Sequence, residues 1–313
     1  MKSTIIKWLF GEPVIRDYSS VSIASDIREH VYLKVENDFI DVSTQQWLLS
    51  LDPVVMGIWS NKNAFNLPGT GIYKLYFTDR ASSGNDVKKN AVAEVDLELF
   101  DKIGEHGGSL NLFRAKASCI YHISQLKISM LFYKFYKKPK LTFDHFKSLV
   151  ATHSYPRRVR LISFRDADYY NIFPMDLLGD LQNENRFVFG LRHSNHSLPK
   201  IISTRKIVVS EFPAHCKNIV YQLGKHHTSQ PLSMDSLPFA SVKTEKFQFD
   251  VPEWVESYKE ISILKTLNLG SHMLLWGEPV NEKRFKPPAA HLFHIPFLLH
   301  LRRKKFGDQY ENA

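Results

Sequence analysis

The chain has 313 residues, of which 43% are hydrophobic and 13% aromatic, a composition that excludes an intrinsically disordered protein and predicts two folded domains, at residues 1–150 and 151–313. Its formal charge of +9 gathers in short basic runs that are typical of solvated faces, and we expect no nucleic-acid partner because no signature of a nucleic-acid-binding module is present. Two widely spaced cysteines, Cys119 and Cys216, and the absence of a signal peptide predict a cytoplasmic protein without a disulfide framework, and no apolar run is long enough to predict a membrane span.

The first half is predicted to be mainly β. Strands are expected where β-branched and aromatic residues run between turn signals, and the alternation of apolar and acidic residues makes residues 91–99 the clearest of them. The other predicted strands of this half cover residues 39–42, 54–59, 72–77 and 109–123, with a turn at 66–71.

Two helices are predicted to connect the halves. The first covers residues 124–136, before Pro139, and the second covers residues 142–152 with Thr142 as its N-cap. The first helix is rich in apolar residues and ends in lysines. This pattern fits packing between the halves or at a dimer seam, with the lysines reaching water, and it also fits docking on a membrane surface or a partner. We favour packing.

The sequence pattern of the second half predicts many strands and few helices. Strands are expected at residues 159–164, 187–189, 206–210, 247–249, 260–264, 273–280 and 294–301, with a helix at 214–223 that ends at Gly224. This pattern favours a β-barrel or sandwich over a parallel sheet covered by helices. No internal repeat is evident between the halves, although the first half is compatible with a degenerate relative of the second.

Two segments of the second half predict a binding site. Residues 169–177 (YYNIFPMDL) are expected to form an apolar loop after a strand, in which Pro174 fixes its own φ angle and biases Phe173 toward an extended conformation. Residues 190–199 (GLRHSNHSLP) carry hydroxyls, an amide and the guanidinium of Arg192, which suit a phosphate. A flat apolar surface beside an anion site is what flavin mononucleotide (FMN) requires.

Four short motifs follow one another in the second half: PRRV at 156–159, NIFPMD at 171–176, SNHS at 194–197 and GSH at 270–272. In this order they resemble the motifs of the flavin reductase-like family of FMN-binding split barrels, which has a Pro-Arg-Pro-Val strand, an Asn-x-x-Pro-x-Ser loop, a Ser/Lys/Thr phosphate loop and a late Gly-Asp-His motif. The resemblance covers residues 151–313. Two residues depart from the family pattern. Asp176 stands where the family often has Ser, and Asn195 stands where Lys is common.

The resemblance implies a C-terminal FMN-binding split barrel. Together with the residue pattern of the first half, this predicts a mainly β protein whose N-terminal β-rich domain ends in helices. It assigns flavin binding to the residues of the two predicted loops, which are Asn171, Ile172, Phe173, Pro174, Met175, Asp176, Arg192, His193, Ser194, His196 and Ser197. His272 is assigned a catalytic place near the flavin or the nicotinamide, with a buried structural histidine as the alternative. Near a flavin, the negative charge of Asp176 would disfavour the anionic reduced flavin unless a cation such as Arg165 paired with it.

The function implied by the resemblance is a flavin reductase-like oxidoreductase that passes electrons from NADH or NADPH through bound FMN to an acceptor. The alternative is a flavin-binding or protein-interaction module without turnover. The family also implies a homodimer with its flavin sites at the subunit seam, for which the candidate aromatic contacts are Trp254, Tyr258, Trp276 and Phe285. No metal site is expected, although His226 and His227 are adjacent, because His291 and His294 on one strand would point to opposite faces.

Overall fold

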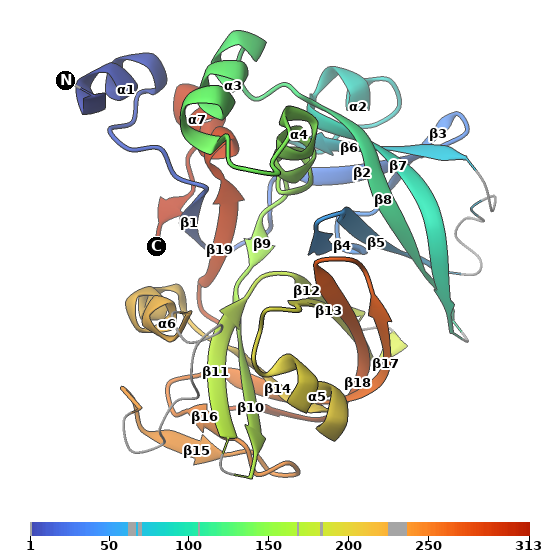
Figure 1. The fold of residues 1–313 in the computed structure, drawn as a ribbon, viewed down its shortest axis with the longest axis vertical. Coiled ribbons are helices and arrows are strands. Elements are labelled where there is room, and N and C mark those ends of the chain that lie inside the picture. Colours follow the sequence, from blue (N-terminus) through green and yellow to red (C-terminus); the bar gives the residue numbers. More distant parts are fainter. Residues whose placement is uncertain are drawn as a thin grey trace.

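The structure is a computed structural model that describes residues 2–61, 67, 71–105, 107–167, 169–181, 184–224 and 237–313. The described residues form two seven-stranded antiparallel sheets, a four-stranded sheet and a small two-stranded sheet, with short helices around them (Figure 1). The mainly β architecture predicted from the sequence is confirmed. Most of the predicted turn at 66–71 lies outside the described residues, as do His226 and His227.

The first sheet has the strand order β3-β2-β6-β7-β8-β5-β4. In β7 the side chains of Ala93, Val95 and Leu97 are buried, whereas Glu94 and Asp96 between them stay partly exposed. This is the alternation expected when one face of a sheet covers a core. The strands of this sheet are β2 (His30–Val35), β3 (Asp38–Asp41), β4 (Gln46–Leu51), β5 (Val54–Asn61), β6 (Ile72–Thr78), β7 (Ala91–Gly104) and β8 (Gly108–Ile120), and the short helix α2 (Asp86–Lys89) precedes β7.

The second sheet has the strand order β11-β10-β14-β17-β18-β13-β12. Its strands are β10 (Arg160–Asp166), β11 (Tyr169–Met175), β12 (Leu178–Leu181), β13 (Arg186–Arg192), β14 (Lys206–Glu211), β17 (Ser257–Asn268) and β18 (His272–Arg284). Helices α5 (Leu198–Thr204) and α6 (Lys217–Leu223) and the hairpin of β15 (Ser241–Lys243) and β16 (Asp250–Pro252) lie between them in the chain. The predicted end of a helix at Gly224 is confirmed, because Gly224 is the C-cap of α6.

The two seven-stranded sheets have the same topology. If the strands of each sheet are numbered along the chain, both sheets place them in the order second, first, fifth, sixth, seventh, fourth, third. The first half of the chain is therefore a topological copy of the second half. This repeat is not evident in the sequence.

A third sheet joins the two ends of the chain to its middle. It has the order β20-β1-β19-β9 and consists of β20 (Glu311–Asn312), β1 (Tyr18–Ile23), β19 (His291–Pro296) and β9 (Arg157–Arg158). Helices α1 (Lys2–Phe10), α3 (Gln125–Leu131), α4 (Phe143–Thr152) and α7 (Phe297–Lys305) gather beside it in the upper part of Figure 1.

The predicted connecting helices are confirmed with one change. The first is α3 followed by a π-helical turn at Phe132–Tyr136, and the second is α4, whose N-cap Thr142 accepts a hydrogen bond from the backbone N–H of His145 at 3.1 Å. Ile128 and Phe132 are buried in a core cluster with Phe146 of α4 and Phe297 of α7. One face of the first helix therefore packs against the other helices, and the favoured place between the halves or at a dimer seam stays a prediction.

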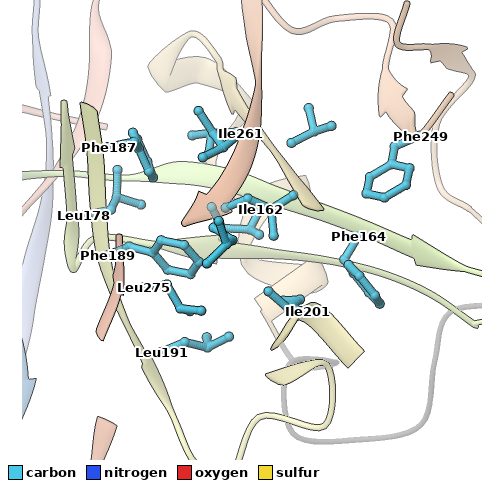
Figure 2. Close-up of a cluster of buried hydrophobic side chains, with 14 of the residues drawn as sticks. Ile162, Phe164, Leu178, Phe187, Phe189, Leu191, Ile201, Phe249, Ile261 and Leu275 are labelled. Atoms are coloured by element: carbon cyan, nitrogen blue, oxygen red, sulfur yellow. The ribbon is translucent and has the colours of Figure 1, made fainter. Parts of the chain in front are cut away.

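Each seven-stranded sheet encloses its own hydrophobic core. Figure 2 shows the core of the second sheet, where Ile162, Phe187, Phe189 and Ile261 come together from three different strands. A separate cluster, here called the interface core, contains residues of both sheets, namely Trp47, Leu49, Val55, Trp59, Leu110, Leu112, Leu181, Val188, Leu269, Leu274 and Trp276. The two sheets thus pack against each other through buried side chains.

Three elements predicted for the second half are wrong. The expected loop at 169–177 is mostly strand β11, which accommodates Pro174 because β11 is an edge strand. The expected strand at 247–249 is not formed, since Gln248 has a φ of 58°, in the left-handed region. The expected strand at 294–301 ends at Pro296, the N-cap of α7, and the following residues are helical.

Candidate functional site

A cavity of about 760 Å³ lies between the two halves of the chain. Its walls include residues 173–177, from the end of β11 to the start of β12, and residues 190–192 at the end of β13. The first half contributes Leu51 at the end of β4 and several residues of α4. Cavities of this size are typical of small-molecule sites. Both halves are needed to form this one.

The first sheet reaches the cavity through the turn after β4. The backbone N–H of Asp52 donates to Oγ of Ser271 at 2.9 Å, and the N–H of Ser271 donates to the carbonyl oxygen of Asp52 at 2.6 Å. Gly270 has a φ of +104°, and a β-carbon there would lie 2.7 Å from the Asp52 carbonyl oxygen. The Gly-Ser-His motif is therefore held in place by the first half of the chain.

His272 lines the cavity and is 1% exposed. Its Nδ1 lies 2.7 Å from Oγ of Ser271 and accepts from the backbone N–H of Leu51 at 3.5 Å. With Nδ1 as acceptor, the ring proton lies on Nε2, which has no partner among the described residues. Burial, and after it the charges of Arg192 and His193, lower the pKa of His272 to about 4. At neutral pH the ring is therefore uncharged and has an unused N–H donor.

Half of the predicted site residues line the cavity. These are Phe173, Pro174, Met175, Asp176, Arg192 and His272. Among the described residues the following predicted ones do not line it: Asn171, Ile172, His193, Ser194, His196 and Ser197. Nδ2 of Asn171 donates instead to Oγ of buried Ser197 at 3.0 Å, Ile172 lies in a core cluster, and His193, Ser194 and His196 are exposed. Their contacts with a flavin stay predictions.

The structure adds Asn195 to the residues that line the cavity. Asn195 is buried, and its Oδ1 accepts a hydrogen bond from the backbone N–H of Ser197 at 2.8 Å. This bond shapes the turn that follows β13, so Asn195 has a structural task where the family pattern has a lysine. The charge at this side of the cavity comes from the exposed Arg192.

Asp176 pairs with a histidine that the sequence does not connect to it. Oδ2 of Asp176 lies 2.7 Å from Nδ1 of His294 in β19, and Nε2 of His294 lies 2.8 Å from the hydroxyl of Tyr221 in α6. The suggested partner Arg165 pairs instead with Asp250 at 2.8 Å, so that expectation is wrong. Asp176 and His294 are 118 positions apart, and no local pattern signals their contact.

Asp176 is expected to stabilise the fold in a pH-dependent way. Burial raises its pKa, but the hydrogen bond and charge of His294, together with His153 and Arg157, lower it from 3.8 to about 2. A carboxyl with a lowered folded-state pKa contributes stability that is complete above its unfolded pKa and is lost as the pH falls through the folded one. At about pH 6 we expect Asp176→Asn to lower the free energy of unfolding by about 2 kcal/mol. Denaturant titration should show this difference shrinking as the pH approaches about 2, and a constant difference would contradict the assignment.

A second cavity, of about 460 Å³, occupies the corresponding place in the first half. Its walls include residues 43–47 between β3 and β4 and the end of β5. The register shows the correspondence, because Asn61 pairs with Gly108 at the start of β8 and Arg192 pairs with His272 at the start of β18. A neutral amide thus stands in the first half where the second half has a guanidinium.

Two further observations concern the described residues only. They contain no group of three potential ligands among His, Cys, Asp and Glu that lie close enough to hold a metal ion. None of their helices is long and apolar enough to cross a membrane. The expected absence of a metal and of a nucleic-acid partner, and the cytoplasmic location, stay predictions.

No protein-family model and no curated protein matches the chain. Among solved structures, an FMN-binding protein from Thermus thermophilus with bound p-hydroxybenzaldehyde is 20% identical with a TM-score of 0.40, over 45% of this chain and 82% of that protein. The NADH:FAD oxidoreductase SgcE6 from Streptomyces globisporus C-1027 is 13% identical with a TM-score of 0.43, over 50% of this chain and 90% of that protein. The flavin reductase of styrene monooxygenase from Pseudomonas putida S12 is 13% identical with a TM-score of 0.39, over 46% of this chain and 91% of that protein. The structural neighbours of this mainly β chain are thus flavin reductases and FMN-binding split-barrel proteins, which match about half of it.

Proposed function

We propose that this chain is a flavin reductase-like oxidoreductase that holds FMN in the cavity between its halves and takes electrons from NADH or NADPH. The observation that supports the proposal most directly is the composition of the cavity. It combines an apolar wall at residues 173–175, the guanidinium of Arg192 and the unused Nε2 donor of His272. A flavin has matching parts, since its ring is flat and largely apolar, its ring edge accepts hydrogen bonds and its phosphate is anionic.

Each part of the cavity has its own task in this proposal. Residues 173–175, with the backbone restricted by Pro174, pack against the ring. Arg192 binds the phosphate through parallel N–H donors, and His272 donates from Nε2 to an acceptor on the ring. Bound flavin supplies the electron-transfer chemistry, whereas the protein binds it, orients it and keeps water away.

The absorbance spectrum of the purified chain tests the proposal. We expect a yellow protein, or one that becomes yellow with added FMN, whose flavin bands bleach when NADH or NADPH is added without oxygen. A yellow protein that does not bleach would support the alternative, a flavin-binding module without turnover. A chain that binds no FMN would contradict both.

Replacing Arg192 by alanine is expected to weaken FMN binding selectively. The change removes a charge-assisted contact worth about 1.5–3 kcal/mol, which corresponds to about a ten- to hundredfold higher Kd. Riboflavin has no phosphate, so its Kd should change little. Titration of both flavins into the wild-type chain and Arg192→Ala measures the difference. Equal losses for the two ligands would place Arg192 away from the phosphate.

The oligomeric state is a separate prediction. The resemblance implies a homodimer, whereas the structure brings two sheets of the same topology together within one chain and completes the cavity there. We therefore expect a chain that binds one FMN as a monomer. Light scattering of the FMN-loaded protein at micromolar concentration measures its mass. The mass of two chains would support the homodimer.

A further inference from the structure

A hydrogen-bonded chain of side chains runs along one wall of the cavity. Asp176, His294 and Tyr221 are all lining residues, and the bonds that join them are 2.7 Å and 2.8 Å long. The hydroxyl of Tyr221 also lies 2.5 Å from Oγ of Ser20. The ring of Tyr18 lies against the ring of His294, with centroids 4.1 Å apart.

The four members of this chain come from four separate parts of the fold. Asp176 follows β11, His294 lies in β19, Tyr221 lies in α6 and Ser20 lies in β1, and β1 pairs with β19 in the third sheet (Figure 1). Ser20 and His294 are direct partners in that pairing. Backbone pairing therefore fixes Ser20 and His294 relative to each other, and hydrogen bonds join Tyr221 and Asp176 to this pair.

We propose that Tyr221 donates a proton to a second substrate in this cavity, and that this substrate is an uncharged aldehyde or ketone whose carbonyl group is reduced. The inference rests on the proposed flavin function and names the class of acceptor that the reduced flavin serves. His294 and Asp176 are positioning residues, which orient the hydroxyl and return a proton to it.

The protonation state of Tyr221 suits this role. Burial raises the pKa of Tyr221 to about 12, with smaller contributions from Tyr18 and Asp176 and an opposing one from the bond to Ser20. The hydroxyl therefore keeps its proton at neutral pH and is available as a donor. Nδ1 of His294 faces the Asp176 carboxylate, so Nε2 is the nitrogen that exchanges a proton with Tyr221.

The wall around the relay favours an uncharged carbonyl compound. Apolar side chains of α4 and α7 line this cavity, including Phe146, Leu149 and Leu298. The charged residues that line it are mixed, with Asp17 and Asp176 beside Lys138 and Arg192, so the cavity has no strong charge of one sign to select a charged substrate. A small aldehyde or ketone buries its apolar part against such walls and needs only one donor for its oxygen.

The hydride and the proton that the carbonyl group gains both have a source in the cavity. The carbonyl carbon gains a hydride, which bound reduced flavin would supply, its carbon–oxygen π bond breaks, and the O–H bond of Tyr221 breaks as its proton moves to the substrate oxygen. The product is an alcohol. The Tyr221 oxygen is then reprotonated from solvent by way of Nε2 of His294, whose ring is held in place by the contact of Nδ1 with Asp176.

Benzaldehyde is the probe, and the FMN-loaded chain is the protein. With NADH or NADPH present we expect benzyl alcohol, and Tyr221→Phe should lower kcat by about a hundredfold or more while flavin bleaching by the nicotinamide continues at the wild-type rate. His294→Gln should lower kcat without changing KM. Tyr133→Phe removes an exposed hydroxyl outside the cavity and is the control expected to behave as wild type.

A second readout does not depend on turnover. The C=O stretching frequency of bound benzaldehyde, from infrared difference spectra, should be lower in wild type than in Tyr221→Phe, because a hydrogen bond from the hydroxyl polarises the carbonyl. This measurement also works on flavin-free protein, so it tests Tyr221 even if the flavin proposal fails. Equal frequencies, or a wild-type chain whose flavin bleaches while benzaldehyde stays unreduced, would overturn the assignment.

Discussion

Replacing Gly190 by alanine is expected to destabilise the folded chain by about 3 kcal/mol, because the added methyl group has no room between the two sheets. A β-carbon at position 190 would lie 1.8 Å from the carbonyl oxygen of Leu49 and 2.7 Å from its carbonyl carbon. Both are backbone atoms of the buried strand β4, so they cannot turn aside as a flexible side chain could. The second sheet would have to move away from the first and open the interface core. Because Gly190 also lines the cavity, FMN affinity should fall with stability.

Gly104→Ala provides the matched control. Gly104 ends β7, and a β-carbon there would have no atom within 4 Å. We expect this variant to stay within about 0.5 kcal/mol of wild type. Chemical denaturation of both variants measures the two free energies of unfolding. Equal stabilities would mean that the sheets do not approach each other as closely at Gly190 as the structure shows.

Close packing between the sheets also makes equivalent positions of the two halves differ. The strand registers place Trp47 at the position of Gly179. These two residues meet in the interface, where a β-carbon on Gly179 would lie 1.5 Å from Nε1 of Trp47. When equivalent strands of two similar sheets pack together, a large side chain on one requires a small one on the other. At this pair of equivalent positions the two halves therefore cannot have the same residue.

Local patterns in the sequence were sufficient for much of the fold. Period-two alternation predicted β7 and the N-cap preference of Thr142 predicted the start of α4, because both signals come from neighbouring residues. The strand β11 was missed since Pro174 is compatible with a strand only at a sheet edge, and the position of a strand in its sheet is a long-range property.

The aromatic residues predicted for a subunit seam illustrate the same limit. Trp276 does lie in a seam, but the seam is inside the chain. Its ring stacks on Trp59 of the first sheet with centroids 6.2 Å apart, and its Nε1 donates to Glu105 at 3.0 Å. Composition can predict that an aromatic residue is at an interface, but it cannot tell whether the partner is another chain or the same one.

The candidate site was predictable only in part. Residues 173–176, Arg192 and His272 lie in motifs, and all of them line the cavity. Tyr221 and His294 were missed as a pair with Asp176 because the third sheet and α6, which bring them together, involve residues far apart in the sequence. A site whose residues come from several distant elements has no characteristic sequence spacing from which it could be predicted.

Replacing Glu29 by glutamine is expected to cost about 3 kcal/mol, because the buried guanidinium of Arg303 loses its buried counter-charge and keeps Asp308, whose side chain is about half exposed. Glu29 precedes β2 and is 1% exposed, and Arg303 in α7 is 5% exposed. Nε and Nη2 of Arg303 donate to Oε1 of Glu29 at 2.9 Å and 2.6 Å, and the hydroxyl of Tyr310 donates to Oε2 at 2.5 Å. This buried network joins the C-terminal helix to the first half of the chain.

Two further variants separate a buried charge from an ordinary ion pair. Glu98 pairs with Lys116 at 3.0 Å, but both side chains are about half exposed, so Glu98→Gln should cost less than about 1 kcal/mol. Adding Arg303→Met to Glu29→Gln removes the guanidinium that has lost its buried partner, and the double variant should regain part of the stability lost in the single one. Chemical denaturation of the three variants gives the comparison. If Glu29→Gln costs no more than Glu98→Gln, the Arg303 charge must reach water, and the tight docking of α7 onto the first half would be wrong.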